Sequence, residues 1–325
     1  MRLAIAFGLV LLLIPTFHQA YAKKIVITAT PITAFQPGNP DQTKFGSLTF
    51  LGGLILESSN ENFGGFSGIR IIEESGKIKA ITDKARFLTG NIIRQKGNIS
   101  GIENARLTRV KAADGRTITG AIDKDAEALE LFGDRIVLGY ERNDRVVTFR
   151  EKDHKLFVDP KAKVHDFTGL DFPKNKGPEA VAYDRNNAQL LVITEYTLND
   201  AGNHRAFLIG KDNLPQELSV QNHDSYSITD AAFLPNGDLL ILERYYSFFS
   251  GVYMRLRRIL GKDIKPGNTL DGEVLISVNN NYKIDNMEGL AVSKTDDEGT
   301  RLTMISDDNF SKSQQTLILE FLLAN

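Results

Sequence analysis

The chain has 325 residues, with 39 Lys and Arg against 41 Asp and Glu, and it contains no cysteine. This near balance of charge argues against nucleic acid or an anionic membrane surface as a partner. The absence of cysteine excludes disulfides, thiol catalysis and zinc sites built on cysteine, so stability must come from a large core.

The first 22 residues have the pattern of a secretory signal peptide. Arg2 precedes an almost wholly apolar stretch over residues 3–15, and Ala20 and Ala22 supply the small residues of a cleavage site. This stretch is shorter than the roughly 20 residues that a membrane helix needs. We therefore expect cleavage after Ala22, a periplasmic or secreted protein and no stable membrane insertion, with an uncleaved anchor as the alternative. Residues 23–325 are expected to form one domain.

Short apolar runs that open with a polar residue recur along the rest of the chain. Each opening is followed by a turn and a second apolar run that ends in an acid, as in "EAVAYDRNNAQLLVITEY". The openings are Ser67, Glu127, Glu179, Asp230 and Glu288, and the second acids are Asp83, Glu141, Glu195, Glu243 and Asp307. Runs rich in Val, Ile and Leu with turns such as "PNGD" predict β-hairpins.

The spacing of these hairpins predicts an all-β fold of the β-propeller type. Neighbouring openings lie 51 to 60 residues apart, which is enough chain for a four-stranded sheet. Removal of residues 1–22 would leave 303 residues, which favours six blades, with five as the alternative because five units are visible. Residues 45–58 and 314–323 supply further strands, which we expect to close the ring between the two ends of the chain.

The order of the blocks resembles a known family. "FGGFSGIRI", "DAEALE", "GPEAVAY", "DAAFLPNGDLLILERYYS" and "NMEGLAV" are followed by "ISDDNFSKSQQTLILEF". Over roughly residues 45–323 they resemble the phytase-like family, described as having esterase-like activity of phytase. The resemblance implies an exported bacterial propeller that hydrolyses phosphoesters. The chain departs from the family pattern at "TDKAR" and in having Ala180, not glycine, after the acid.

Acids repeated at the entry of each innermost strand should form a ring at one mouth of the propeller channel. Two like charges 4 Å apart repel by about 4 kcal/mol at an effective dielectric constant of 20, so such a ring needs protons, arginines or a cation. Oxygen ligands without His or Cys suit Ca²⁺, with Mg²⁺ as the alternative. The predicted metal ligands are Glu127, Glu179, Asp230, Glu288, Asp307 and Asp308. A purely structural role, in which the acids accept hydrogen bonds from loop amides, stays open.

Arginines near the second acids are candidates for holding a phosphate, which guanidinium groups bind bidentately. The predicted substrate-binding residues are Arg86, Arg142, Arg145 and Arg244. The sequence thus favours a monomeric metal-dependent phosphoester hydrolase with a small phosphorylated or ester substrate, and no catalytic residue is assigned. One alternative is a calcium-dependent lactonase-type propeller that does not need the arginines. Another is a non-enzymatic propeller that binds a protein or glycan through the aromatic segment 243–253.

Overall fold

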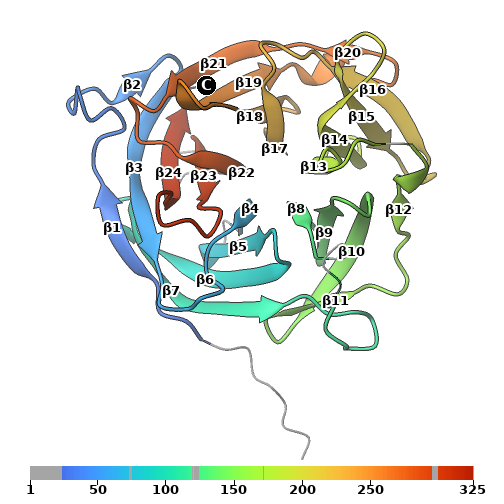
Figure 1. Cartoon of the computed structure of the whole chain (residues 1–325), viewed down its shortest axis with the longest axis horizontal. Coiled ribbons are helices and arrows are strands. Elements are labelled where there is room, and N and C mark those ends of the chain that lie inside the picture. Colours follow the sequence, from blue (N-terminus) through green and yellow to red (C-terminus); the bar gives the residue numbers. More distant parts are fainter. Residues whose placement is uncertain are drawn as a thin grey trace, which may run out of the picture.

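The strands that the structure describes form five sheets set around a central axis (Figure 1). The computed structural model describes residues 24–72, 75–118, 120, 124–170, 172–294 and 299–324, and the sheets are arranged like the blades of a propeller (Figure 1). The all-β propeller prediction is therefore confirmed. Among the described residues, the short 3-10 helices η2 (Thr168–Leu170) and η3 (Gly261–Asp263) interrupt the strands.

Three sheets follow one another directly in the chain, and each is built from its innermost strand outward. The first contains β4 (Phe66–Ile72), β5 (Lys77–Thr82), β6 (Arg86–Gln95) and β7 (Asn98–Arg109). The second contains β8 (Ala126–Phe132), β9 (Arg135–Tyr140), β10 (Arg145–Lys152) and β11 (Lys155–Val158), with β12 (His165–Asp166) also on β10. The third contains β13 (Pro178–Asp184), β14 (Gln189–Leu198), β15 (His204–Ile209), β16 (Pro215–Val220) and β20 (Thr269–Leu270).

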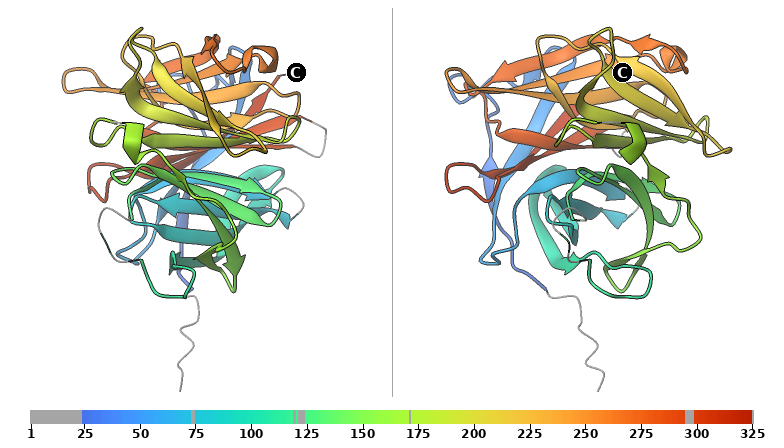
Figure 2. Two further views of the ribbon diagram at one scale, coloured as in Figure 1. Left: turned by 90° about the vertical axis from the view of Figure 1, so that its right-hand side faces the viewer. Right: turned by 45° about the vertical axis from the view of Figure 1, so that its right-hand side comes forward.

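The fourth and fifth sheets complete the molecule. The fourth contains β17 (Ser227–Phe233), β18 (Leu239–Ser247), β19 (Gly251–Ile259) and β21 (Glu273–Asn279). The fifth contains β22 (Asn286–Lys294), β23 (Thr300–Asp307), β24 (Thr316–Leu323), β3 (Leu48–Glu57) and β1 (Thr28–Ile32), with β2 (Lys44–Phe45) also on β3. Side views show that the connections between strands gather at the two faces of the propeller (Figure 2).

The number of blades differs from the favoured prediction of six. The described residues form five sheets, because the N-terminal strands do not begin a blade of their own. Instead β3 pairs antiparallel with β24, from Leu48↔Leu323 to Leu56↔Thr316, and β1 adds outside β3. The two terminal segments therefore share one sheet. The predicted signal peptide at residues 1–22 lies outside the described residues, and no helix within them is long and apolar enough to span a membrane.

Turn chemistry and apolar faces explain why these runs become hairpins that pack. Between β17 and β18, Gly237 has φ +91°, which suits glycine, and the Leu234 amide donates to the Asp238 carbonyl at 2.7 Å. Neighbouring sheets bury their facing side chains, as Ile193 and Ile241 do in one cluster between the third and fourth sheets. The hydrophobic core thus lies between neighbouring blades, and this packing fixes the innermost strands around the channel.

Every innermost strand carries a β-bulge at its entry, and this feature positions the site. The pairing register skips one residue in each case: Ser67 in β4, Glu127 in β8, Glu179 in β13, Thr229 in β17 and Glu288 in β22. A β-bulge changes the direction in which the side chain of the extra residue points. Two of these bulges are followed by tightly confined glycines: a Cβ on Gly68 would lie 3.0 Å from the Leu129 Cβ, and a Cβ on Gly289 would lie 3.0 Å from the Ile69 amide nitrogen.

Candidate functional site

A cavity of about 790 Å³ is lined by the three acids that occupy bulge positions, Glu127, Glu179 and Glu288. Nine carboxylates and three cations line it, which gives a formal net charge of −6. The acids are Asp83, Asp125, Glu127, Glu141, Glu179, Glu195, Asp285, Glu288 and Asp307, and the cations are Arg142, Lys176 and Arg244. This excess of carboxylates dominates the chemistry of the cavity.

Four of the six predicted metal ligands lie in this cavity. Glu127, Glu179 and Glu288 reach it from the bulges of β8, β13 and β22, and Asp307 reaches it from the end of β23. The second acids Asp83, Glu141 and Glu195 also line it, although they are not among the ligands predicted from the sequence. The signal for them in the sequence is their recurrence, since each ends a second apolar run.

Three carboxylates in the cavity are close enough to share one cation. Asp125, Glu127 and Glu141 each offer an oxygen, and these three oxygens lie within 4.8 Å of one another. Asp125 also pairs with Arg142 at 2.7 Å, and Glu141 accepts a hydrogen bond from the Gly177 amide at 3.2 Å. These oxygen ligands come from around the start of β8 and the end of β9, and such a set suits the loose coordination of Ca²⁺.

Glu179 provides independent evidence for a bound cation or proton in the cavity. Its side chain lines the cavity, the residue is only 7% exposed, and its Oε2 has no hydrogen-bond partner among the described residues. A buried carboxylate oxygen without a donor is costly, because it has lost water and gained nothing in return. A proton or a bound cation would remove this cost.

The protonation of these acids reflects their crowding. Burial, reinforced by the neighbouring carboxylates, raises the pKa of Glu127 and of Glu179 well above the usual range. Burial and repulsion from Glu195 raise the pKa of Glu141 to about 8. The pKa of Glu288 rises to about 7 through burial, although Arg244 opposes the shift, and that of Asp307 rises to about 7 chiefly through burial. Without a cation, several of these acids therefore hold protons at neutral pH.

The cations of the cavity are already engaged with acids. Lys176 lies 2.6 Å from Glu195, and Arg244 approaches Glu195 at 3.3 Å. The Nε atom of Arg244 is 3.1 Å from Glu288, but its N–H is not directed at an acceptor. Of the four predicted substrate-binding arginines, only Arg142 and Arg244 line the cavity.

The other two arginines are used elsewhere and are not among the lining residues. Arg86 donates to Asn62 Oδ1 at 2.6 Å. Arg145 donates to the Asn143 carbonyl at 2.8 Å, and its guanidinium lies 4.3 Å from the centre of the Tyr140 ring.

Asp230 lies away from this cavity, in the channel itself. The bulge in β17 falls at Thr229, so Asp230 occupies the confined position that is glycine or alanine in the other four inner strands. Its two oxygens accept from Arg70 at 2.7 and 3.1 Å and from the Leu290 and Ala231 amides at 2.7 and 2.8 Å. With its oxygens so occupied, Asp230 is not part of the cation site that the geometry supports.

Asp308 also differs from its neighbour Asp307. Its Oδ1 accepts from the Gly65 and Phe310 amides at 2.9 and 3.0 Å, and its Oδ2 accepts from the Thr316 hydroxyl at 3.0 Å. Asp308 therefore ties the loop after β23 to the loop before β4. It does not line the cavity.

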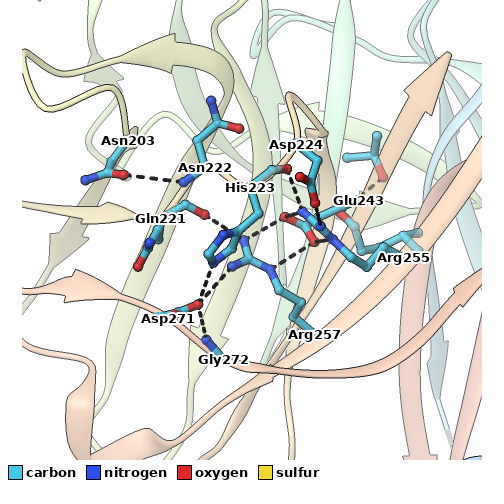
Figure 3. Close-up of polar contacts among 12 residues, drawn as sticks. Asn203, Gln221, Asn222, His223, Asp224, Glu243, Arg255, Arg257, Asp271 and Gly272 are labelled. Carbon is cyan, nitrogen blue, oxygen red and sulfur yellow. Dashed lines mark hydrogen bonds and ion pairs between the residues drawn. The ribbon is translucent and has the colours of Figure 1, made fainter. Parts of the chain in front are cut away.

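The fourth sheet supplies no carboxylate to the cavity. Its bulged residue is Thr229, whose hydroxyl donates to the Met287 carbonyl at 3.0 Å. Its second acid, Glu243, is fully buried between Arg255 and Arg257, which approach it at 2.7 and 2.6 Å (Figure 3). This sheet contributes the neighbouring Arg244 to the cavity instead.

Comparison with known proteins gives a family match and similarities of fold. Residues 61–310 match the family described as "Phytase-like: Esterase-like activity of phytase", and no curated protein matches the chain. The PQQ-bound aldose sugar dehydrogenase from Streptomyces coelicolor is 12% identical, with a TM-score of 0.44 over 86% of this chain and 99% of that one. The tail fibre of Staphylococcus aureus phage P68 is 12% identical, with a TM-score of 0.45 over 88% of this chain and 54% of that one. At these values the two structures carry no information about activity.

Proposed function

The chain belongs to the phytase-like family, described as esterase-like activity of phytase, and from this we propose that it is a calcium-dependent phosphoester hydrolase acting in the acidic cavity. The observation that carries the proposal is the unpartnered Oε2 of Glu179 beside the carboxylate triad of Asp125, Glu127 and Glu141. Mg²⁺ is the alternative ion, but carboxylates from several loops fit the flexible coordination of Ca²⁺ better.

The proposed ligand set differs from the one predicted from sequence alone. Asp125, Glu127, Glu141 and Glu179 form its centre, and Glu288 and Asp307 extend it. One divalent ion would reduce the formal charge of the lining only from −6 to −4. Because a phosphate is itself an anion, its entry favours the binding of more than one cation or the retention of protons on some of the acids.

The residues of the chain have separate roles in this proposal. A bound cation would polarise the phosphoryl oxygen and lower the pKa of a coordinated water. Arg244, whose Nε–H is free of a directed acceptor, would donate to a second phosphoryl oxygen. Glu288, whose carboxylate lies 3.1 Å from the Nε atom of Arg244, would extend the ligand set.

Hydrolysis of an aryl phosphoester tests the proposal. The chelator-treated protein should be inactive, calcium should restore release of the aryl alcohol, and Glu127→Gln and Glu179→Gln should each lower the rate at least a hundredfold. Glu57→Gln, an exposed change at the end of β3, serves as the matched control. Hydrolysis of a lactone but not of a phosphoester would favour the lactonase alternative. Activity that persists after exhaustive chelation would refute the metal-dependent proposal.

We also propose that the protein is exported and that its mature chain starts at Lys23. The apolar stretch and the Ala20 and Ala22 pair support cleavage after Ala22. N-terminal sequencing of the exported protein should give Lys23 as the first residue. Recovery of a chain that still carries Met1 would contradict this proposal.

A further inference from the structure

An exposed aromatic turn stands beside the acidic cavity. Strands β18 and β19 remain paired out to Ser247↔Gly251, so the hairpin is formed up to its tip. At that tip, Phe248 and Phe249 are 84% and 96% exposed, and their ring centroids lie 5.5 Å apart. Adjacent phenylalanine rings left in water at the end of an ordered hairpin indicate a contact surface.

The same hairpin forms one side of the cavity. Tyr246, Gly251 and Val252 are among the lining residues, and Ile284 joins them from the connection before β22. Tyr246 is itself 60% exposed. The lining of the cavity therefore has an aromatic and apolar part, supplied mainly by this hairpin, in addition to its carboxylates.

The charge of the cavity limits how many anionic groups a ligand can bring. Each lining cation already faces an acid: Arg142 faces Asp125, Lys176 faces Glu195, and Arg244 faces Glu288 and Glu195. Each further phosphate on a ligand would therefore need a further bound cation, since the lining cations already face acids. A ligand with one phosphate needs only the bound cation and Arg244.

We infer that the substrate is a phosphoester with a single anionic group and an apolar alkyl or aryl group, which packs on Tyr246, Phe248 and Phe249. This inference rests on the proposed function and narrows it. In the reaction, the oxygen of water forms a bond to phosphorus, the bond from phosphorus to the departing alcohol oxygen breaks, and a proton from water ends on that alcohol. No oxidant or further reactant is required.

Binding of non-hydrolysable phosphonates tests this inference without relying on turnover. Calorimetry at fixed free calcium should show octylphosphonate binding at least tenfold more tightly than methylphosphonate, since each buried methylene strengthens binding. In the double variant Phe248→Ser/Phe249→Ser this ratio should fall to about threefold or less, with methylphosphonate affinity unchanged. Leu214→Ser, an exposed apolar change in the connection between β15 and β16, should keep the wild-type ratio. Inositol hexakisphosphate should bind more weakly than octylphosphonate at the same free calcium.

Each contrary outcome points to a different error. If the double variant keeps the octyl preference, or if inositol hexakisphosphate binds more tightly, the inference is overturned while calcium-dependent hydrolysis stands. If the double variant loses binding to phosphatidylcholine vesicles with no change in octylphosphonate affinity, the hairpin docks on a membrane and the inference is again wrong. If calcium binds but neither phosphonate does, both the inference and the proposed function fail.

Discussion

The guanidinium of Arg70 lies 2.7 Å from the carboxylate of Asp230, and this ion pair crosses the channel from β4 to β17. Arg70 also donates to the carbonyls of Leu290, Val181 and Ala231 and to Glu130, so one side chain contacts all five inner strands. Both residues of the pair are buried. The Arg70–Asp230 pair therefore links the five inner strands at the centre of the propeller.

Arg70→Met should destabilise the fold strongly. The change leaves Asp230 buried without its cationic partner and removes the Arg70 hydrogen bonds to four carbonyls, for which a loss of about 3–5 kcal/mol is expected. Urea unfolding measures this loss, with Arg185→Met, an exposed arginine, as the control. A loss of unfolding free energy below about 1 kcal/mol in Arg70→Met would show that the Arg70–Asp230 pair contributes little to stability.

Without calcium, stability should fall as the pH rises. The pKa of Glu141 is about 8 and those of Glu288 and Asp307 are about 7 in the folded protein. In the unfolded chain these groups ionise near pH 4, so between about pH 4 and pH 8 the folded state binds more protons than the unfolded state. Stability is then lost as the pH rises through that range, at up to about 1.4 kcal/mol for each unit of pKa difference.

The melting temperature of chelator-treated protein should accordingly be higher at pH 5 than at pH 8. Added calcium should reverse this order, because the metal binds the ionised carboxylates and displaces their protons. The variant Glu141→Gln should flatten the pH dependence of the chelated protein. A chelated protein whose melting temperature rises between pH 5 and pH 8 would show that the acids are not crowded as described.

Removal of residues 314–325 should unfold the protein. Strand β24 lies between β3 and β23, so its loss exposes two strand edges and disconnects the N-terminal strands from the fifth sheet. Circular dichroism during thermal unfolding should show loss of the cooperative transition. A shorter deletion of residues 324 and 325 provides the control and should melt close to wild type. An unchanged transition in the longer deletion would count against closure of the ring by the terminal strands.

The sequence predicted much of the fold and part of the site, for identifiable reasons. The acids Glu127, Glu179 and Glu288 recur at strand entries, so their convergence in one cavity follows from the propeller repeat. The sequence pattern groups Asp230 with these acids, but the bulge in β17 shifts the register by one residue. No residue pattern in the sequence indicates this shift. Thr229 is the true equivalent of the other bulged residues.

The number of blades and the contacts of the arginines depend on long-range pairing, which local sequence patterns do not contain. The apolar segment 45–58 predicts strands, but its pairing with β24 is what reduces the number of blades from six to five. Likewise, Arg86 and Arg142 both lie near second acids in the sequence. Only the fold directs Arg142 to the cavity and Arg86 to Asn62.

Calcium titration of chelator-treated protein by calorimetry tests the central claim most directly. Wild type should bind calcium and gain about 2.7 kcal/mol of stability at a hundredfold excess over Kd. Glu127→Gln and Glu179→Gln should stay folded and lose most of that gain, and Glu57→Gln should behave like wild type. Absence of calcium binding by wild type at millimolar concentration would contradict the metal site and leave the carboxylates of the cavity with a structural role.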